Sequence, residues 1–352
     1  MARLKEYNGH YCESEYEYAF IGFLEAEGWI YSSGNNISRV TKRDVLIADD
    51  FKKFIVDTNP DLTEDEVTQI FDNVRLVGSE SDFATLHKVY GWMVDGMQFT
   101  PQDGIARMIP LIDFKKDSNR NIFRVVNQFT VEYTNNGQKE NRRPDVLLFV
   151  NGMPLCVIEL KNPADANATI YDAWEQINIR YWRDIPHLLH YCPLACISDG
   201  VKTRLGTVRI PYEHFYAWRR VNDGDAVSTL PFEETETMIK GVYAPERFLE
   251  IFRDYIYFQD SIYDSDEVEI VCRYPQFFAA RLLKQSIINS VVQKSGKGGT
   301  YFGATGCGKT YTMAFLARQL ALRCTDIPEI GSPTIILIVD RDELQKQGAK
   351  LF

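Results

Sequence analysis

Apolar side chains recur along this chain with two different spacings, and the spacing changes near residue 123. Between residues 13 and 27 the spacing is helical. Phe20, Ile21 and Leu24 fall on one face, and Gly28 follows them. Because a glycine just after a periodic segment is a typical helix end, this stretch predicts an amphipathic helix.

Two further segments predict helices. Residues 61–73 carry Thr63 in the N-cap position and Glu66 three residues later, a pairing that closes a helix N-terminus. Residues 170–181 show the same helical spacing. Helices are therefore expected on both sides of a central region with strand-like spacing.

In that central region, short apolar or alternating runs predict strands. Four are expected, at residues 123–133, 146–150, 155–160 and 193–198. Asn151-Gly152 is a typical hairpin turn and would join the second strand to the third. Strands mixed with helices indicate an α/β domain over residues 1–205.

The rest of the chain divides into two parts. Residues 206–262 carry weaker signals and an acidic stretch, and we interpret them as a connector. Residues 263–352 predict a second domain, in which a strand at Tyr301-Phe302, a glycine-rich loop, a helix to about Arg323 and a buried strand at 334–339 follow one another. This order is that of the first part of a RecA-like P-loop domain. Because it stops at Phe352, we expect an N-terminal fragment.

Composition excludes several classes of protein. The chain has 352 residues, 45% of them hydrophobic and 25% charged, which is ordinary for a globular protein. It has no apolar run long enough for a membrane helix and no signal-peptide core, so we expect a cytoplasmic protein without a membrane partner. The seven cysteines are scattered and are expected to be reduced. A net charge of −10 argues against nucleic-acid binding over the whole surface, but a local basic groove stays possible.

The glycine-rich loop has a clear chemical interpretation. Gly303, Gly306, Gly308, Lys309 and Thr310 fit the pattern GxxxxGK[ST]. Its glycines let backbone N–H groups surround phosphates, the lysine reaches the β and γ phosphates, and the threonine hydroxyl binds Mg²⁺. A site for ATP with Mg²⁺ is therefore predicted.

A second set of residues suits metal-dependent phosphodiester cleavage. Two carboxylates, Asp145 and Glu159, could hold Mg²⁺, and Lys161 could position water or stabilise developing charge. A strand places Glu159 and Lys161 on one side. A plain two-residue turn would put Asp145 on the other side, whereas a three-residue loop, Val150 to Gly152, would put all three together. A shared metal site therefore predicts a bulged turn.

The alternative is that Glu159 and Lys161 form a solvated pair on a half-exposed strand, which is common. The apolar run at residues 155–160 weakens that alternative. A strand buried on both faces rarely ends in two charges unless they are paired or functional.

Several segments together carry a resemblance to a known family. They are residues 121–129, Arg143-Pro144-Asp145, residues 149–154 and residues 157–163. They resemble the N-terminal nuclease domain of type I restriction enzyme R (HsdR) subunits, which are PD-(D/E)xK nucleases. The resemblance implies a restriction-endonuclease-like fold, a metal held by Asp145 and Glu159, and a catalytic role for Lys161.

The same resemblance implies further site residues. The family carries a Gln-xxx-Tyr element on the next helix, but here Gln176 and Tyr181 are one residue too far apart. Gln176 would share a helix face with Arg180 instead, leaving Tyr181 displaced. The family's first helix often supplies an acidic residue. Glu17 is the candidate, with a role as a helix-dipole partner as the alternative.

In the second domain, residues 273–280 resemble the family's adenine-side motif, with Gln276 as the adenine contact, or alternatively as a helix N-terminal residue beside packed aromatics. Residues 340–345 resemble motif Ia of superfamily 2 helicases. Because no Walker B acid is present before Phe352, we expect nucleotide binding without useful ATP hydrolysis.

The resemblance implies the restriction and translocase subunit of a type I system, acting on double-stranded DNA with methyltransferase and specificity subunits. Two alternatives stay open: a stand-alone nuclease-ATPase of another defence or repair system, and a nucleotide-gated DNA-binding module with an inactive nuclease centre. Co-purification with a methyltransferase distinguishes the first alternative. An unchanged cleavage rate after Lys161→Ala in the full complex would favour the second.

Overall fold

The structure is a computed structural model that describes residues 13–78, 81–162, 169–227, 233–259, 267–304, 306–325 and 327–338. The chain separates into two compact units, and each is described by itself. Unit 1 holds residues 1–221 and 226–249, and unit 2 holds residues 222–225 and 250–352. The domain boundaries expected from the sequence stay a prediction.

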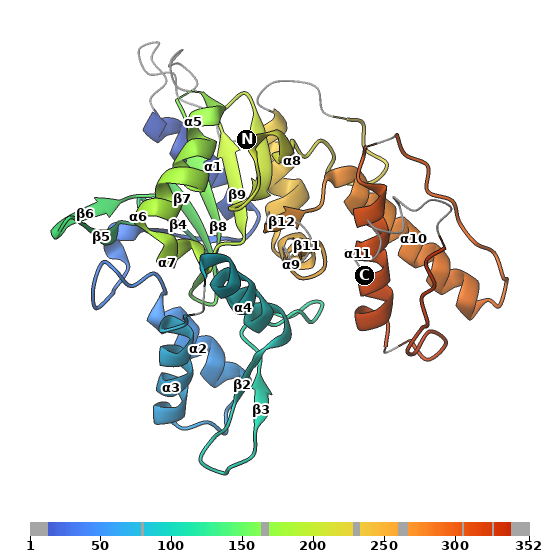
Figure 1. Ribbon diagram of the computed structural model, residues 1–352, viewed down its shortest axis with the longest axis horizontal. Helices are drawn as coiled ribbons and strands as arrows, with labels where there is room; N and C mark the ends of the chain where they lie inside the picture. The colour runs from blue at the N-terminus through green and yellow to red at the C-terminus, as the bar shows by residue number, and fades with distance from the viewer. Residues whose placement is uncertain are drawn as a thin grey trace. The chain divides into compact units, whose positions relative to one another are not determined.

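Unit 1 contains a six-stranded sheet of mixed direction, in the order β1-β4-β7-β8-β9-β10. Its strands are β1 (Ile30–Ser33), β4 (Phe123–Asn127), β7 (Val146–Val150), β8 (Met153–Leu160), β9 (Leu194–Ser198) and β10 (Thr203–Thr207). The β1–β4 and β8–β9 pairs are parallel and the other neighbours antiparallel. Every residue of β7 and β8 is buried, as expected for central strands covered on both faces. The α/β prediction is confirmed at this level (Figure 1).

The helices of unit 1 before the sheet centre are α1 (Glu13–Ala26), α2 (Ala48–Thr58), α3 (Glu64–Arg75) and α4 (Asp82–Asp95), with a short 3₁₀ turn at Gly34–Asn36. α1 agrees with its predicted range, and Phe20 and Leu24 are fully buried on it. The predicted cap of α3 is confirmed. Thr63 and Glu66 form a reciprocal capping box, and a second one is formed by Thr169 and Asp172 ahead of α5.

The later helical elements of unit 1 are α5 (Ile170–Glu175), a π-helical turn (Gln176–Tyr181), α6 (Trp182–Asp184), α7 (Pro186–Leu189), a 3₁₀ turn (Tyr212–His214), α8 (Glu233–Met238), a second π-helical turn (Ile239–Tyr243) and α9 (Pro245–Asp254). The boundary between the two units falls within α9. Met238, Val242 and Tyr243, in the segment interpreted as a connector, are fully buried.

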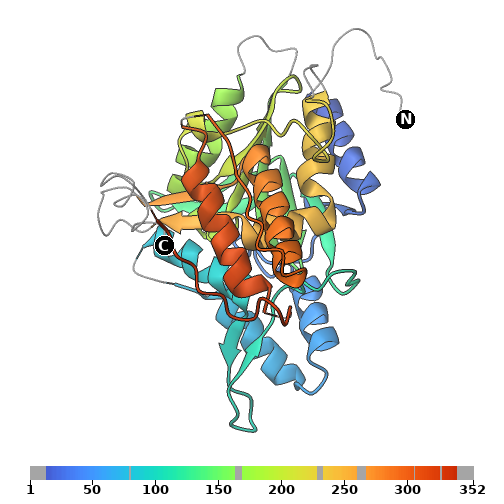
Figure 2. The same ribbon diagram turned by 90° about the vertical axis from the view of Figure 1, so that its right-hand side faces the viewer.

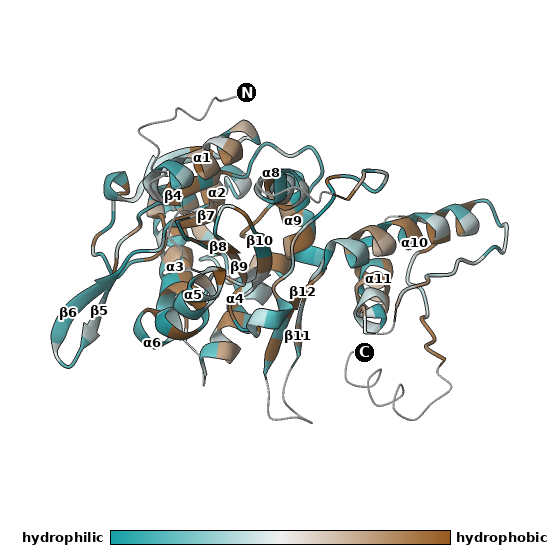
Figure 3. Ribbon diagram, turned by 90° about the horizontal axis from the view of Figure 1, so that it is seen from above, coloured by the Kyte–Doolittle hydropathy of each residue, from teal (hydrophilic) through white to brown (hydrophobic). Residues whose placement is uncertain are grey.

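The predicted strand at 123–133 is two strands in different sheets. β4 ends at Asn127, Gln128 takes a positive φ of 53°, and β5 (Val131–Asn135) then pairs with β6 (Gln138–Arg142) in a separate hairpin. Another hairpin joins β2 (Met97–Phe99) to β3 (Arg107–Ile109). Figure 3 colours β5 and β6 hydrophilic and the central strands hydrophobic, in keeping with the solvent exposure of most β6 residues.

The hairpin between β7 and β8 corrects one prediction. Its turn is not bulged. Asn151 (φ 51°) and Gly152 (φ 76°) form a plain two-residue turn, in which Val150 pairs with Met153. Any side chain at Gly152 would meet the Ile47 carbonyl oxygen at 2.2 Å, so helix α2 requires glycine there. The register shifts further along, between the Leu148 and Phe149 pairs, so that the irregularity lies within β8.

Unit 2 contains β11 (Ile256–Gln259), β12 (Val268–Val271), α10 (Tyr274–Val292) and α11 (Lys309–Arg323). β11 and β12 pair with each other, and α10 lies beside α11 in both views (Figures 1 and 2). The helix predicted to end near Arg323 is confirmed.

Two strand predictions in unit 2 are wrong. Tyr301-Phe302 and residues 334–338 form no strand, and Phe302, Ile336 and Ile338 are 92%, 78% and 88% exposed. A strand needs a hydrogen-bonding neighbour, and among the described residues of unit 2 the only strands, β11 and β12, already pair with each other. Val339 and the motif Ia residues 340–345 lie outside the described residues.

Two findings bear on composition. Six cysteines lie in the described part of the chain, and all are free thiols, five of them buried. In the same part of the chain, no helix combines the length and apolar character needed to cross a membrane.

Candidate metal centre and phosphate loop

The carboxylates of Asp145 and Glu159 lie on the same side of the sheet. Val146 pairs with Ile158, so the irregularity in β8 sets Asp145 opposite Glu159. Directly opposed residues project to the same face. The Leu160 N–H also donates to Asp145 Oδ2 at 2.8 Å. The predicted shared face is therefore present, although the device that produces it lies within the strand and not in the turn.

Glu159 is fully buried, and its two oxygens differ. Oε1 accepts a hydrogen bond from the Tyr181 hydroxyl at 2.5 Å, whereas Oε2 is buried and has no hydrogen-bond partner. Burial, reinforced by the neighbouring Asp145 carboxylate, raises the pKa of Glu159 well above its ordinary value of 4.5. A buried oxygen without a donor is costly, so this position calls for a bound cation or a proton.

Lys161, Gln176 and Tyr181 form a chain of hydrogen bonds that ends on Glu159. Lys161 Nζ donates to Gln176 Oε1 at 2.9 Å, and Gln176 Nε2 donates to the Tyr181 hydroxyl at 2.9 Å. Burial raises the pKa of Tyr181 well above 10, so its hydroxyl stays a donor toward Glu159. Four of the predicted site residues are thus connected.

The prediction that Tyr181 is displaced from Gln176 is wrong, and the π-helical turn explains why. A π-helix is wider than an α-helix and forms hydrogen bonds between residues five apart, whereas in an α-helix residues four apart share a face. The turn over Gln176–Tyr181 therefore brings residues with five-residue spacing together. Arg180, expected on the face of Gln176, forms an ion pair with Glu175 at 2.7 Å.

The donor set fits Mg²⁺. Among the described residues no group of three or more His, Cys, Asp or Glu side chains could hold a metal, so the centre offers two carboxylates, Asp145 and Glu159. Mg²⁺ prefers oxygen ligands and retains several waters, so two carboxylates are enough. The partnerless Glu159 Oε2 is a position that such an ion would satisfy.

Glu17, on α1, lies against the end of the neighbouring strand β4. It is 5% exposed, and its carboxylate accepts hydrogen bonds from Asn127 Nδ2 and Gln128 Nε2, both at 2.6 Å. The Gln128 N–H in turn donates to the Asp145 carbonyl oxygen at 3.0 Å. Sequence reasoning missed Asn127 and Gln128 as partners of Glu17. The sequence feature that could have indicated them is the pair of adjacent amide side chains at the end of an apolar strand.

In unit 2, the glycine-rich loop precedes helix α11. Gly306 and Gly308 have φ values of 79° and 80°, a backbone region that favours glycine, and Gly308 is the N-cap of α11. Lys309 Nζ donates to the carbonyl oxygens of Gly303 (2.7 Å) and Ala304 (2.9 Å). The ammonium group thus lies over the loop that would surround a phosphate. Thr310 is the second residue of α11.

Gln276 is 4% exposed, and both ends of its amide are used. Oε1 accepts from the Arg273 N–H at 2.8 Å in a capping box, and Nε2 donates to the Gly308 carbonyl oxygen at 3.0 Å. The structure therefore joins Gln276 to the glycine-rich loop. Its role as an adenine contact stays a prediction.

Lys309→Ala is expected to weaken ATP binding by roughly tenfold or more, because a charge-assisted contact with the phosphates is lost. Titration of a fluorescent ATP analogue measures this, with Lys297→Ala, an exposed lysine of the same unit, as the control. Equal affinity of Lys309→Ala and the unaltered chain would contradict the assignment of this loop.

The structure thus has a buried carboxylate pair on a mixed sheet in unit 1 and a glycine-rich loop ahead of a helix in unit 2. Comparison with known families assigns both regions. Residues 11–214 match the family described as type I restriction enzyme R protein N terminus, and residues 275–352 match the SWI2/SNF2 ATPase family. The chain belongs to the type I restriction enzyme R protein family.

Among curated relatives, the chain is 28% identical to a putative type I restriction enzyme MjaIXP endonuclease subunit of Methanocaldococcus jannaschii, over 96% of this chain and 33% of that protein. It is also 28% identical to the type I restriction enzyme HindI endonuclease subunit of Haemophilus influenzae, over 97% of this chain and 32% of that protein. The chain thus spans about a third of the length of these relatives.

Proposed function

We propose that this chain is the nuclease-bearing part of a type I restriction subunit, with a restriction-endonuclease-like fold in unit 1 and a nucleotide-binding, RecA-like start in unit 2. The reaction is Mg²⁺-dependent cleavage of double-stranded DNA, coupled to ATP-driven translocation by the whole subunit. The observation that carries the proposal is the buried Glu159 Oε2 without a hydrogen-bond partner, beside the Asp145 carboxylate.

Asp145 and Glu159 would hold Mg²⁺, which when bound activates water and neutralises charge on the phosphodiester. The Leu160 N–H orients the Asp145 carboxylate, and the Tyr181 hydroxyl orients that of Glu159. Lys161 supplies a positive charge near the developing negative charge of the phosphate, and Gln176 fixes its ammonium group. Glu17, held by two amides beside Asp145, is proposed as a further acidic group of the centre.

The relatives are called endonuclease subunits of type I restriction enzymes, which supports assembly with further subunits, and we propose that these are the methyltransferase and specificity subunits. The same two motifs would also suit a stand-alone nuclease-ATPase. Co-purification of the tagged whole protein with a methyltransferase is the expected outcome, and its isolation without one would favour the stand-alone alternative.

A metal-binding measurement tests the centre independently of cleavage. Titration with Mn²⁺, followed by electron paramagnetic resonance, is expected to detect one site in unit 1 that Asp145→Ala abolishes. Asp65→Ala removes an exposed carboxylate of α3 and is expected to leave the site intact. Saturable Mn²⁺ binding of equal strength in both variants would overturn the assignment of Asp145 as a ligand.

A further inference from the structure

An exposed basic loop is built beside the metal centre. It consists of residues 40–43, Val-Thr-Lys-Arg, and we name it the basic loop. Its first anchor is Arg39, whose guanidinium lies 3.8 Å from the centre of the Phe129 ring. Arg39 Nη1 also donates to the carbonyl oxygens of Asp44 (3.1 Å) and Thr130 (2.9 Å). Arg39 therefore joins the two ends of the loop to the segment that follows β4.

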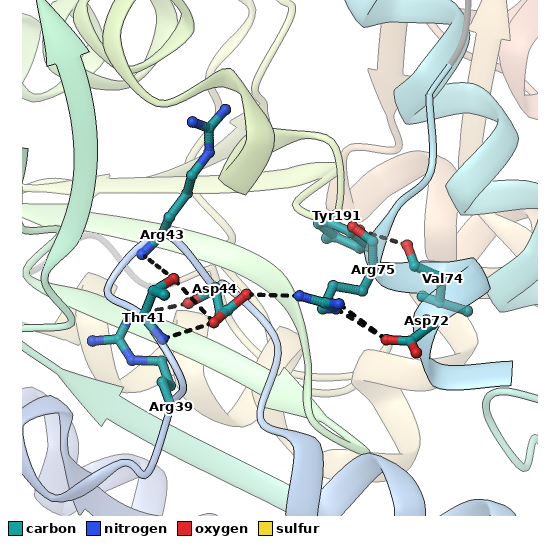
Figure 4. Close-up of polar contacts among 8 residues, drawn as sticks. All are labelled: Arg39, Thr41, Arg43, Asp44, Asp72, Val74, Arg75 and Tyr191. Atoms are coloured by element: carbon teal, nitrogen blue, oxygen red, sulfur yellow. Dashed lines mark hydrogen bonds and ion pairs between the residues drawn. The ribbon is translucent and has the colours of Figure 1, made fainter. Parts of the chain in front are cut away.

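The second anchor is Asp44, at the other end of the loop (Figure 4). Asp44 Oδ2 accepts from the backbone N–H (2.9 Å) and the hydroxyl (3.1 Å) of Thr41, and Oδ1 lies 3.4 Å from Arg75 Nη1 on α3. The Glu132 N–H donates to the Lys42 carbonyl oxygen at 3.0 Å. The backbone of the basic loop is thus fixed by several elements.

The two cationic side chains of the loop take no part in these contacts. Lys42 and Arg43 are exposed, and neither forms an ion pair with any described residue. In Figure 4 the Arg43 guanidinium points away from Asp44 and Arg75, and only its backbone nitrogen is bonded, to Thr41 Oγ1. Neighbouring arginines differ, since Arg75, Arg142 and Arg183 all pair with aspartates.

The loop lies close to the metal centre by two routes. Arg39 and the loop contact the backbone of Thr130 and Glu132, which follow Gln128 by two and four positions in the sequence. The Gln128 N–H donates to the Asp145 carbonyl oxygen. On the other side, the pKa of His187 on α7 is lowered to about 4 by burial and then by the charge of Arg43. α7 begins five residues after Tyr181. The loop therefore lies between the segment that follows β4 and helix α7, and each of these is close in sequence to a residue of the centre.

We propose that the basic loop binds the phosphate backbone of DNA next to the metal centre, through Lys42 and Arg43. The inference rests on the proposed function. Lys42 and Arg43 are adjacent cations without an ion pair among the described residues, on a loop whose backbone is hydrogen-bonded at both ends, and their charge is opposite to that of a phosphate chain. Because the loop backbone is already fixed, binding orders few additional groups.

The test is DNA binding by the whole 352-residue chain in EDTA, where neither cleavage nor a bridging metal contributes. Fluorescence anisotropy with a labelled duplex is measured at several salt concentrations. For Lys42→Ala/Arg43→Ala we expect affinity about tenfold lower and a slope of log K against log salt smaller by about 2, as for two lost phosphate contacts. Lys42→Arg/Arg43→Lys keeps both charges and should restore most of the binding.

The matched control is Lys115→Ala/Lys116→Ala. These two exposed lysines lie in the loop before Asn121, which binds Asn151 in the turn at the other end of β7 from Asp145. An equal loss of affinity in the control would mean that only the net charge matters, and it would overturn the proposal. An unchanged salt slope in the Lys42/Arg43 variant, or no duplex binding by the unaltered chain, would also overturn it. The Mn²⁺ site should survive in the Lys42/Arg43 variant, so the fate of the metal centre is decided separately.

Discussion

Replacing Glu159 with glutamine is expected to stabilise the metal-free protein and at the same time to abolish divalent-cation binding. The Glu159 carboxyl group is fully buried beside Asp145, which raises its pKa, and one of its oxygens has no donor. A glutamine of the same shape can keep its carbonyl oxygen on the Tyr181 hydroxyl and direct its amide N–H groups toward Asp145. We expect a gain of roughly 1–3 kcal/mol in the free energy of unfolding at neutral pH.

The pH dependence follows from the direction of the pKa shift. Burial raises the pKa of Glu159 in the folded protein above its value in the unfolded chain. Below the unfolded value the group is protonated in both states and costs nothing. As pH rises above that value, the unfolded chain loses the proton first, so stability falls until the folded pKa is passed. Glu159→Gln should remove this loss of stability between acidic and neutral pH.

Glu140→Gln is the matched control, because Glu140 also accepts a hydrogen bond from a tyrosine hydroxyl, that of Tyr133. Glu140 lies on the exposed β5–β6 hairpin, and the bond from Tyr133 lowers its pKa. Its contribution to stability has the opposite sign, being present above the unfolded pKa and lost as pH falls through the folded one.

Chemical denaturation at several pH values, with and without Mn²⁺, measures both effects. Mn²⁺ should raise the stability of the unaltered chain and of Glu140→Gln, but not that of Glu159→Gln. A Glu159→Gln protein that is less stable than the parent at pH 8 without metal would show that burial of the Glu159 carboxylate does not destabilise the folded state.

The local pattern was sufficient where the decisive contacts are local. The α1 range, the Thr63 cap and the strands of the β7–β8 hairpin follow from spacing and turn chemistry along a few residues. The sequence also predicted that Asp145 and Glu159 share a face, because a metal site needs both carboxylates on the same side. The irregularity within β8 that achieves it was not predicted. The bulge was expected in the turn, where Gly152 instead lies against the Ile47 carbonyl oxygen at the start of α2, distant in sequence.

Other errors came from treating apolar spacing as proof of a strand. Residues 334–338 have the composition of a buried strand, but the structure leaves Ile336 and Ile338 exposed. Composition reports a preference for burial and says nothing of which neighbour provides the hydrogen bonds. Likewise, the continuous pattern over 123–133 conceals the break at Gln128, where side chain and backbone are engaged by Glu17 and Asp145. That break is a tertiary feature.

Deleting Ile179 is expected to leave the metal centre intact, although it removes a residue from a helix that supplies the site. Gln176 and Tyr181 are aligned by a π-helical turn, which amounts to one extra residue within an α-helix. Removing one residue changes the spacing from five to four, and an α-helix aligns residues four apart. Ile179 is 48% exposed, so little packing is lost. We expect the free energy of unfolding to change by less than about 1 kcal/mol.

Deleting Lys88 from the regular helix α4 is the matched control. It also removes one exposed residue, but it rotates the two halves of the helix by about 100° relative to each other. Buried Phe83 and Leu86 on one side can then no longer share a face with Val89 and Met93 on the other. We expect a destabilisation of at least about 3 kcal/mol, measured by the same denaturation experiment.

A double-mutant cycle reports on the site itself. Tyr181→Phe removes the hydroxyl that orients Glu159 and should weaken Mn²⁺ binding in the unaltered chain. In the Ile179 deletion the same substitution should weaken binding by the same factor, because the tyrosine again lies beside Gln176 and Glu159. If the deletion alone abolished Mn²⁺ binding, as Asp145→Ala is expected to do, the π-helical turn would be a required part of the centre. Its role would then not be limited to placing Tyr181 beside Gln176.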